Sequence, residues 1–345
     1  MSFFTQFTNG QQNFPTFTVG FSASTTWVAP ASGFVRVYAV GAGGSGGTVN
    51  RTGTPHIRRA CGGGAGGFSI KTAYVTSGQS FTITIGAGGA VSQAAADSAA
   101  NGNPGGTTSV VSTGVSLTCT GGGGGGAAIG NGTATAGAGG TATGGDINNT
   151  GGSGGTVATS TTTQVFWASG GGAVGIFGTG YSAGDINVSG TPDAGQQAAT
   201  GGASVGARSG GVTQTSSVAT GGAGCGGPSA VNSTVAGLGL PASEIGSVFG
   251  ASLVSAGTAG TNAVGSSAAG LGAGGGANRN NNNTVNGDCA GFGGSGGSAG
   301  VDSKVTGKCF FGGGSGAAVT DVGGGTAAVA NLGGDGLVII QYLGG

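Results

Sequence analysis

The serine–glycine motifs are the residues whose spacing first suggests chemistry. The pattern Gly-x-Ser-x-Gly, which can place a nucleophilic serine on a sharp turn, occurs at residues 43–47, 151–155 and 293–297. Such a serine needs a histidine base, and His56 is the single histidine of the chain. Because 90 of the 345 residues are glycine, composition alone produces such matches. We therefore expect no nucleophilic catalysis from them.

The motifs for phosphate binding and for acid–base catalysis lack the neighbouring residues that these functions need. The pattern Gly-x-Gly-x-x-Gly at residues 41–46 follows an expected strand, but no helix is expected after it to receive a phosphate. Gly307-Lys308 is followed by Cys309 rather than by the Ser or Thr of a phosphate-binding loop. Glu244 is the single glutamate and the eight aspartates are dispersed, although an aspartate pair that meets in space stays open. We expect a protein that is not an enzyme and carries no cofactor.

Metal-binding patterns are also missing. The five cysteines are odd in number and form no Cys-x-x-Cys pair, so we expect no zinc site and free, buried thiols, with one or more disulfides as the alternative. The tetrapeptide Gly-Asp-Ile-Asn occurs at residues 145–148 and again at 184–187. Its Asp and Asn side chains predict a turn that is used twice. The alternative is a calcium site built from Asp146 and Asp185.

Charge and hydropathy narrow the class of protein. Hydrophobic residues make up 37% of the chain and charged residues 5%, with nine basic and nine acidic side chains. This balance favours a packed chain over a disordered linker, and it lacks the basic surface of a nucleic-acid binder. No apolar run approaches the ~18 residues of a membrane span, and residues 1–6 do not resemble a secretory signal. We expect synthesis in a cytoplasm and use elsewhere, as part of an assembled particle.

Alternating β-forming residues predict strands near both ends of the chain. Residues 17–40 predict two strands, broken by Pro30 and Gly33. Similar patterns cover residues 68–71, 80–85, 107–119 and 336–342. Since a lone C-terminal strand is unstable, we expect it to pair with a strand from the first 120 residues. The nearest candidate for a helix is Pro241–Leu253, for which we expect one or two turns.

Short glycine runs separate the remaining segments. They recur about a dozen times, as in residues 41–47, 62–67 and 121–126. Glycine is costly to order, so clusters of it suggest that the missing Cβ is used. Packed, three-residue-per-turn polyglycine II-type helices meet this requirement, and flexible linkers are the alternative.

The predicted fold class is all-β, with a β-sandwich-like module formed by both chain ends and a polyglycine-helix bundle. The predicted domains are residues 1–120, completed by strand 336–343, and a glycine-rich region of residues 121–335 with display loops.

Several stretches in order resemble glycine-rich bacteriophage tail-fibre proteins. The first is Thr26-Trp27-Val28-Ala29-Pro30, followed by the strand at residues 34–40 that runs into Gly-Ala-Gly-Gly. Residues 62–68, 78–89 and 105–108 continue the likeness, and residues 336–342 look like the terminal strand of that group. The resemblance implies a virion protein that displays loops to the host surface. More loosely, the chain is similar to polyglycine-sandwich adhesins of T-even-type phages.

Receptor contact is expected in the loops, because glycine helices present almost no side chains. Expected partners are a host cell-surface receptor, either a glycan or a surface protein, and other virion tail proteins, with the chain as a homotrimer or as a monomer on a trimeric fibre. Nucleic acid and membrane insertion are not expected. The residues predicted to contact the receptor are Arg279, Asn280, Asn281, Asn282, Asn283, Phe166, Trp167, Tyr181, His56 and Arg58.

Two rival functions stay open. An ice-binding protein would use the abundant threonines, but it would need them regularly spaced on one flat face, and Thr161–Thr163 and Thr107-Thr108 are not. A glycine-rich structural protein of a cell surface is the second rival, against which the lack of an export signal counts. For the proposed contact residues the alternative is an ordinary loop or core role.

Overall fold

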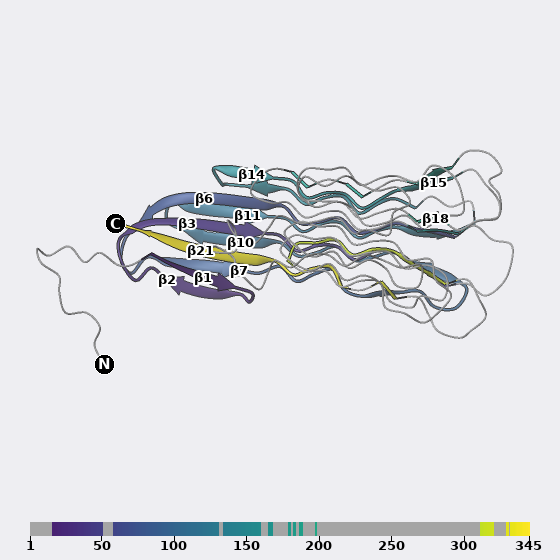
Figure 1. Cartoon of the computed structure of the whole chain (residues 1–345). Coiled ribbons are helices and arrows are strands. Elements are labelled where there is room, and N and C mark those ends of the chain that lie inside the picture. The colour runs from purple at the N-terminus through teal and green to yellow at the C-terminus, as the bar shows by residue number, and fades with distance from the viewer. Residues whose placement is uncertain are drawn as a thin grey trace, which may run out of the picture.

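The computed structural model describes eleven ranges of the chain, and all of its regular elements are β-strands. Figure 1 shows arrow-shaped strands gathered at one end, with extended segments running side by side away from them. The predicted all-β class with a sandwich formed by both chain ends is confirmed. The helix candidate Pro241–Leu253 lies outside the described residues. The residues that the structure describes are 16–50, 58–130, 134–159, 165–167, 179–180, 182–183, 186–188, 197–198, 311–320, 329–330 and 332–345.

Two five-stranded antiparallel sheets form a sandwich. The first sheet has the order β1–β21–β3–β6–β14, and the second has the order β13–β11–β10–β7–β2. The strands of the first sheet are β1 (Phe17–Phe21), β3 (Gly33–Val40), β6 (Phe68–Val75), β14 (Ile147–Asn149) and β21 (Leu337–Gly344). Those of the second are β2 (Thr25–Val28), β7 (Ser80–Thr84), β10 (Thr108–Ser112), β11 (Val115–Cys119) and β13 (Ala142–Thr143).

Alternation along the strands builds the core between the two sheets. In β3, the side chains of Val35, Val37 and Ala39 point inward and are buried. Phe34, at the start of the same strand, is exposed. The same alternation buries Phe81 and Ile83 in β7. Side chains from both sheets therefore meet in one apolar cluster, which also contains Val110, Val115, Leu117, Cys119, Val338, Ile340 and Tyr342.

The first and last described strands pair within the first sheet. Strand β21 lies between β1 and β3, and it pairs antiparallel with both. The Phe17 ring stacks on the Tyr342 ring at 5.3 Å between centroids, and the Tyr342 hydroxyl donates to the Ser32 carbonyl at 2.8 Å. The predicted pairing of the C-terminal strand with a strand from the first 120 residues is confirmed.

The sandwich strands differ from the prediction at two turns. Residues 17–40 hold three strands rather than two, because the chain crosses from the first sheet to the second at Ser22–Ser24. Residues 107–119 form the hairpin β10–β11 rather than one strand. Its turn contains Gly114, whose φ of +74° is a conformation that favours glycine.

Shorter strands lie at the other end of the extended segments, and we call them the distal strands. All of them are two or three residues long, and they pair in four small sheets, with the orders β12–β5–β16–β18, β19–β4–β9, β15–β17 and β20–β8. They are β4 (Thr48–Asn50), β5 (Arg58–Ala60), β8 (Ser92–Gln93), β9 (Ser98–Ala100), β12 (Ala127–Ile129), β15 (Val157–Thr159), β16 (Val165–Trp167), β17 (Ile186–Val188), β18 (Gln197–Ala198), β19 (Ala318–Thr320) and β20 (Val329–Ala330).

Glycine-rich segments connect the sandwich with the distal strands. Residues 41–47, for example, leave β3 and enter β4, and residues 61–67 return from β5 to β6. We call these and their equivalents the glycine segments. The others in the described residues are 85–91, 101–107, 120–126, 135–141, 150–156, 311–317 and 332–336.

The segment 41–47 lies at the centre of this bundle. All of its residues are buried, and its backbone exchanges hydrogen bonds with six other described segments. Buried peptide groups must find partners, and here most partners are the peptide groups of neighbouring segments, although the Gly46 amide donates to the Ser315 hydroxyl at 2.8 Å. The six neighbours are residues 61–67, 85–91, 101–107, 120–126, 311–317 and 332–336.

These hydrogen bonds repeat every third residue. The intervening residues of segment 41–47 bond to other neighbours, so each turn of three residues serves several segments in rotation. A helix with three residues per turn and no internal hydrogen bonds would give this repeat, so the repeat is compatible with polyglycine II-type helices, which stay a prediction. The clearest series runs from the amides of Gly41, Gly44 and Gly47 to the carbonyls of Gly67, Gly64 and Cys61, at 2.8, 2.8 and 2.9 Å.

Close backbone approach explains why the segments are glycine. A Cβ added at Gly44 would lie within 3.0 Å of the Gly122 and Gly123 carbonyl oxygens, and one at Gly122 would meet Gly64. Residues with side chains also recur at intervals of three, as do Ala42 and Ser45. The Ser45 hydroxyl accepts a hydrogen bond from the Asn103 amide at 2.8 Å, so this side chain joins the bundle.

The glycine segments before and after residue 120 belong to one hydrogen-bond network. Gly122 and Gly125 donate to Ala42 and Ser45, and Gly64 donates to Gly123. The division into residues 1–120 and 121–335 stays a prediction, because much of the second range lies outside the described residues. Within the described part, sandwich and bundle alternate along the chain.

Candidate functional site

The distal end of the bundle is the candidate site, because the distal strands and the described link 94–97 lie there. Residues 51–57 join β4 to β5, 94–97 join β8 to β9, and 160–164 join β15 to β16. Residues 321–328 likewise join β19 to β20. The first and last described strands, β1 and β21, lie in the sandwich at the opposite end (Figure 1). One end thus holds the described chain ends, and the other holds the distal strands.

The link between β8 and β9 is described in full and was not singled out by its sequence. Ala94 is buried, and the Ser98 amide and hydroxyl donate to the Ala95 carbonyl at 3.3 and 2.8 Å. Asp97 has a φ of 52°, a left-handed conformation that aspartate tolerates better than most residues. The turn holds Asp97 exposed at the distal end. A single acidic residue among alanines was the available signal.

Two of the predicted contact segments come together in one distal sheet. Strand β16 pairs parallel with β5, which places Phe166 opposite Arg59 and Trp167 opposite Ala60. Arg58 opposes Val165 in the same pairing. Segments that are far apart in the sequence therefore share this sheet, although the side chains of β16 lie outside the described part.

Arg58 does not lie where the sequence placed it. Its side chain is 1% exposed and that of Arg59 is 7% exposed, so both are covered. Desolvation by burial lowers the pKa of Arg59 from its usual value, and the nearby Cys61 opposes the shift. A guanidinium this deeply covered is not presented to a receptor, and Arg58 fits a supporting role beneath the distal surface better.

The remaining predicted contact residues lie outside the described part of the chain. Their assignment stays a prediction. These are His56, Tyr181 and Arg279–Asn283.

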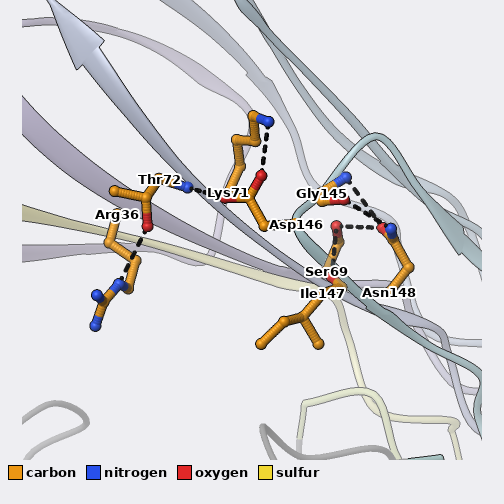
Figure 2. Close-up of polar contacts among 8 residues, drawn as sticks. All are labelled: Arg36, Ser69, Lys71, Thr72, Gly145, Asp146, Ile147 and Asn148. Carbon is orange, nitrogen blue, oxygen red and sulfur yellow. Dashed lines mark hydrogen bonds and ion pairs between the residues drawn. The ribbon is translucent and has the colours of Figure 1, made fainter.

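The first Gly-Asp-Ile-Asn sequence closes a turn at the sandwich end, as its side chains predicted. The Asn148 side chain donates to the Gly145 carbonyl at 2.8 Å, and its oxygen accepts from the Gly145 amide at 3.0 Å. The Ser69 hydroxyl donates to the same oxygen at 2.8 Å. Figure 2 shows these contacts where the turn meets β6. Of the second copy, residues 184 and 185 lie outside the described part.

Asp146 in this turn binds protein groups. Its carboxylate accepts from the Lys71 ammonium at 2.7 Å and from the Thr72 amide at 2.8 Å (Figure 2). The hydrogen bond from Lys71, followed by that from Thr72, lowers the pKa of Asp146. Among the described residues no group of three His, Cys, Asp or Glu side chains could hold a metal. The predicted turn therefore accounts for the contacts of Asp146, whereas Asp185 lies outside the described residues.

The residues of the hydrolase-like motif at 43–47 are structural. Ser45 is fully buried, and its amide donates to the Asn103 carbonyl while its hydroxyl accepts from the Asn103 amide. Its glycine neighbours make the backbone contacts of the central segment. Ser45 therefore does not face a space where a substrate could bind.

Two cysteines are described, and both are free and buried. These are Cys61 in a glycine segment and Cys119 in β11. The Cys119 thiol donates to the Ala39 carbonyl at 3.4 Å, and burial raises its pKa to about 12. The prediction of free, buried thiols is confirmed for these two, while Cys225, Cys289 and Cys309 lie outside the described part.

Comparison with known families gives one match. The sequence profile of the glycine-rich domain family matches residues 18–237, which is more than half of the chain. The chain belongs to the glycine-rich domain family. The range matched by this glycine-rich domain begins in β1 and ends before β21, so the strand that completes the first sheet lies beyond it.

Other comparisons add little to this assignment. A search of curated proteins finds no match to this glycine-rich domain protein. In the described residues, no helix is long and apolar enough to cross a membrane.

Proposed function

We propose that this glycine-rich domain protein is a bacteriophage virion protein, of the tail-fibre or adhesin type, that binds a host cell-surface receptor through its distal end. The observation that carries the proposal is the polarity of the fold. The described chain ends lie in the sandwich, and the distal strands, which the remaining links join, lie at the opposite end. A chain attached to a particle by its sandwich would point those links outward.

The bundle suits the role of a stiff spacer between attachment and recognition. Segment 41–47 is held by backbone hydrogen bonds to six described segments. At a rise of ~3.1 Å per residue, seven residues of a three-residue-per-turn helix span roughly 20 Å. Since the glycine segments carry few side chains, discrimination between receptors depends on the links between the distal strands. The polar Arg279–Asn283 and the aromatic Phe166 and Trp167 remain the proposed contacts, with a glycan as the favoured receptor.

A competition assay tests the proposed function. Phage particles that carry this chain are adsorbed to their host in the presence of the purified, full-length protein. We expect the protein to bind the cells and to lower the adsorption rate as its concentration rises, whereas a heat-unfolded sample has no effect. Binding to no host cell together with unchanged adsorption would contradict the proposal.

The second sheet gives a specific reason to keep ice binding as a second candidate. Its outer face carries hydroxyl side chains in register across four strands, in the row Thr84, Ser109, Thr118 and Thr143. Neighbouring strands lie ~4.8 Å apart, so the row is regular although its residues are scattered in the sequence. A parallel row of Thr26, Thr82 and Ser116 is interrupted by Val111. Thermal hysteresis of the purified protein would support this candidate, and freezing indistinguishable from that of buffer would remove it.

A further inference from the structure

The sandwich has two sides, and only one of them is protected against strand pairing. On one side the edge strands are β13, with two residues, and β14, with three. The chain enters β14 through Asp146, which is paired with Lys71. Very short edge strands and charged side chains are the usual means by which sheets avoid pairing with other chains.

The opposite side carries β1 and β2. Strand β1 has five residues, Phe-Thr-Val-Gly-Phe, with neither a charge nor a proline. No further strand pairs with its outer edge in the part of the chain that the structure describes. The three residues Ser22–Ser24 connect β1 to β2, so both sheets end on this same side. An uncharged edge of this length is a template for a further strand.

Gly20 in the middle of β1 points to the same surface. Its φ is not in the left-handed region, and no atom lies within 4 Å of the position that a Cβ would take. The glycines of the bundle are needed because neighbouring backbone fills that position, and nothing comparable applies here. A glycine inside a strand often marks a bulge, a tight bend, or a place where a ligand or another backbone approaches closely.

We propose that β1 pairs with β1 of a second copy of this chain, antiparallel and centred on Val19. In that register Phe17 opposes the partner's Phe21, and Val19 opposes the partner's Val19. The half-buried side chains Phe17, Val19 and Phe21 lie on the core face of the strand. On the outer face Thr18 opposes the partner's Gly20, where the open space above Gly20 admits the threonine. The five-residue strand is thus self-complementary, as a two-fold interface requires.

The size of the contact sets its expected strength. Two five-residue strands bury less than the ~1,200 Å² at which stable interfaces begin, so the pairing is transient at low protein concentration. Because β2 lies on the same side, a two-fold axis perpendicular to the sheets brings the two second sheets edge to edge as well. We therefore expect reversible dimers that form as concentration rises.

Sedimentation velocity of the full chain, over about a hundredfold range of concentration, tests the pairing. The double variant Thr18→Lys/Gly20→Lys places like charges opposite one another across the axis, and both positions are exposed. We expect concentration-dependent dimers of the unaltered protein and a monomer for this variant, with an unchanged melting temperature. The matched control Thr84→Lys/Ser116→Lys, on the outer face of the second sheet, should dimerise like the unaltered protein.

A second variant keeps the proposal testable if the double variant fails to fold. Val19→Cys opposes itself across the axis, where residues in antiparallel pairs lie ~4.5–5.5 Å apart at Cα. Mild oxidation should therefore link it into dimers faster than it links the unaltered protein. A monomer at every concentration without Val19→Cys cross-linking would overturn the proposal, as would equal association of the Lys variant and its control.

Discussion

At the scale of single residues, the glycines of the bundle are required by their neighbours. Gly122 is buried, and a Cβ there would come within 3.0 Å of the Gly64 and Ala65 carbonyl oxygens. At Gly20 the same atom would meet nothing within 4 Å. Substitutions at the two positions therefore distinguish the steric effect of an added Cβ from the effect of losing a glycine.

We expect Gly122→Ala to destabilise the fold by about 1–3 kcal/mol or more, because the added methyl overpacks a tight interior. Gly20→Ala should stay within about 0.5 kcal/mol of the unaltered protein, as for ordinary surface changes. Urea unfolding at a low protein concentration measures both. Equal tolerance at the two positions would favour the interpretation of the glycine runs as flexible linkers.

Ionisation of Cys119 is expected to lower the stability of the fold at alkaline pH. Burial raises the pKa of this thiol to about 12, so it stays protonated in the folded chain while the unfolded chain ionises at lower pH. Its contribution to stability is present below the unfolded pKa and is lost as pH rises through about 12. Thermal unfolding between pH 8 and pH 11 should show a steeper decline for the unaltered protein than for Cys119→Ala. Parallel declines would show that this thiol is not responsible.

At the scale of elements, the sandwich strands follow from alternation and the distal strands do not. Residues 80–85 show the alternation of a half-buried strand and form β7. Strands such as β4 and β5, with three residues each, are too short to show a period. Their positions are set by the glycine segments that connect them with the sandwich. The recurrence of side chains at every third residue, as at Thr150, Ser153 and Thr156, was the usable signal for those segments.

The turn before β14 is expected to depend on one side chain. Asn148 makes hydrogen bonds with both backbone groups of Gly145 and with the Ser69 hydroxyl. Asn148→Ala should destabilise the turn by about 1–2 kcal/mol, because its partners lose a hydrogen bond. Amides of β14 should then exchange faster with deuterium, while those of β3 remain protected. Unchanged exchange in β14 would show that the strand is held by its pairing with β6 alone.

At the scale of the whole molecule, the fold depends on the C-terminal strand. Val338, Ile340 and Tyr342 of β21 lie in the core, and the strand separates β1 from β3. Deletion of residues 336–345 should therefore abolish cooperative unfolding or lower the melting temperature by many degrees. Circular dichroism on heating measures this, and an unchanged melting temperature would contradict the fold. The sequence predicted this closure because a lone terminal strand needs partners.

The candidate site was less accessible from sequence than the fold. Arg58 was predicted as a receptor contact because the segment Asn50–Arg59 holds the single histidine and three of the nine basic residues, but its side chain is 1% exposed. The meeting of β5 with β16 depends on pairing between segments that are far apart in the chain, which no local pattern encodes. Conversely, the single Asp97 turn is exposed at the distal end although its sequence carries no motif.

Adsorption of the labelled, full-length protein to host cells tests the central claim most directly, namely that the proposed contact residues, and not the sandwich, bind the receptor. Two variants are compared with the unaltered protein: Asn280–Asn283 replaced by alanine, and Thr84→Lys/Ser116→Lys on the sandwich face as the control. We predict that the alanine variant binds host cells more weakly while its stability stays within about 0.5 kcal/mol, and that the sandwich variant binds normally. Weaker binding by the sandwich variant together with normal binding by the alanine variant would contradict the account.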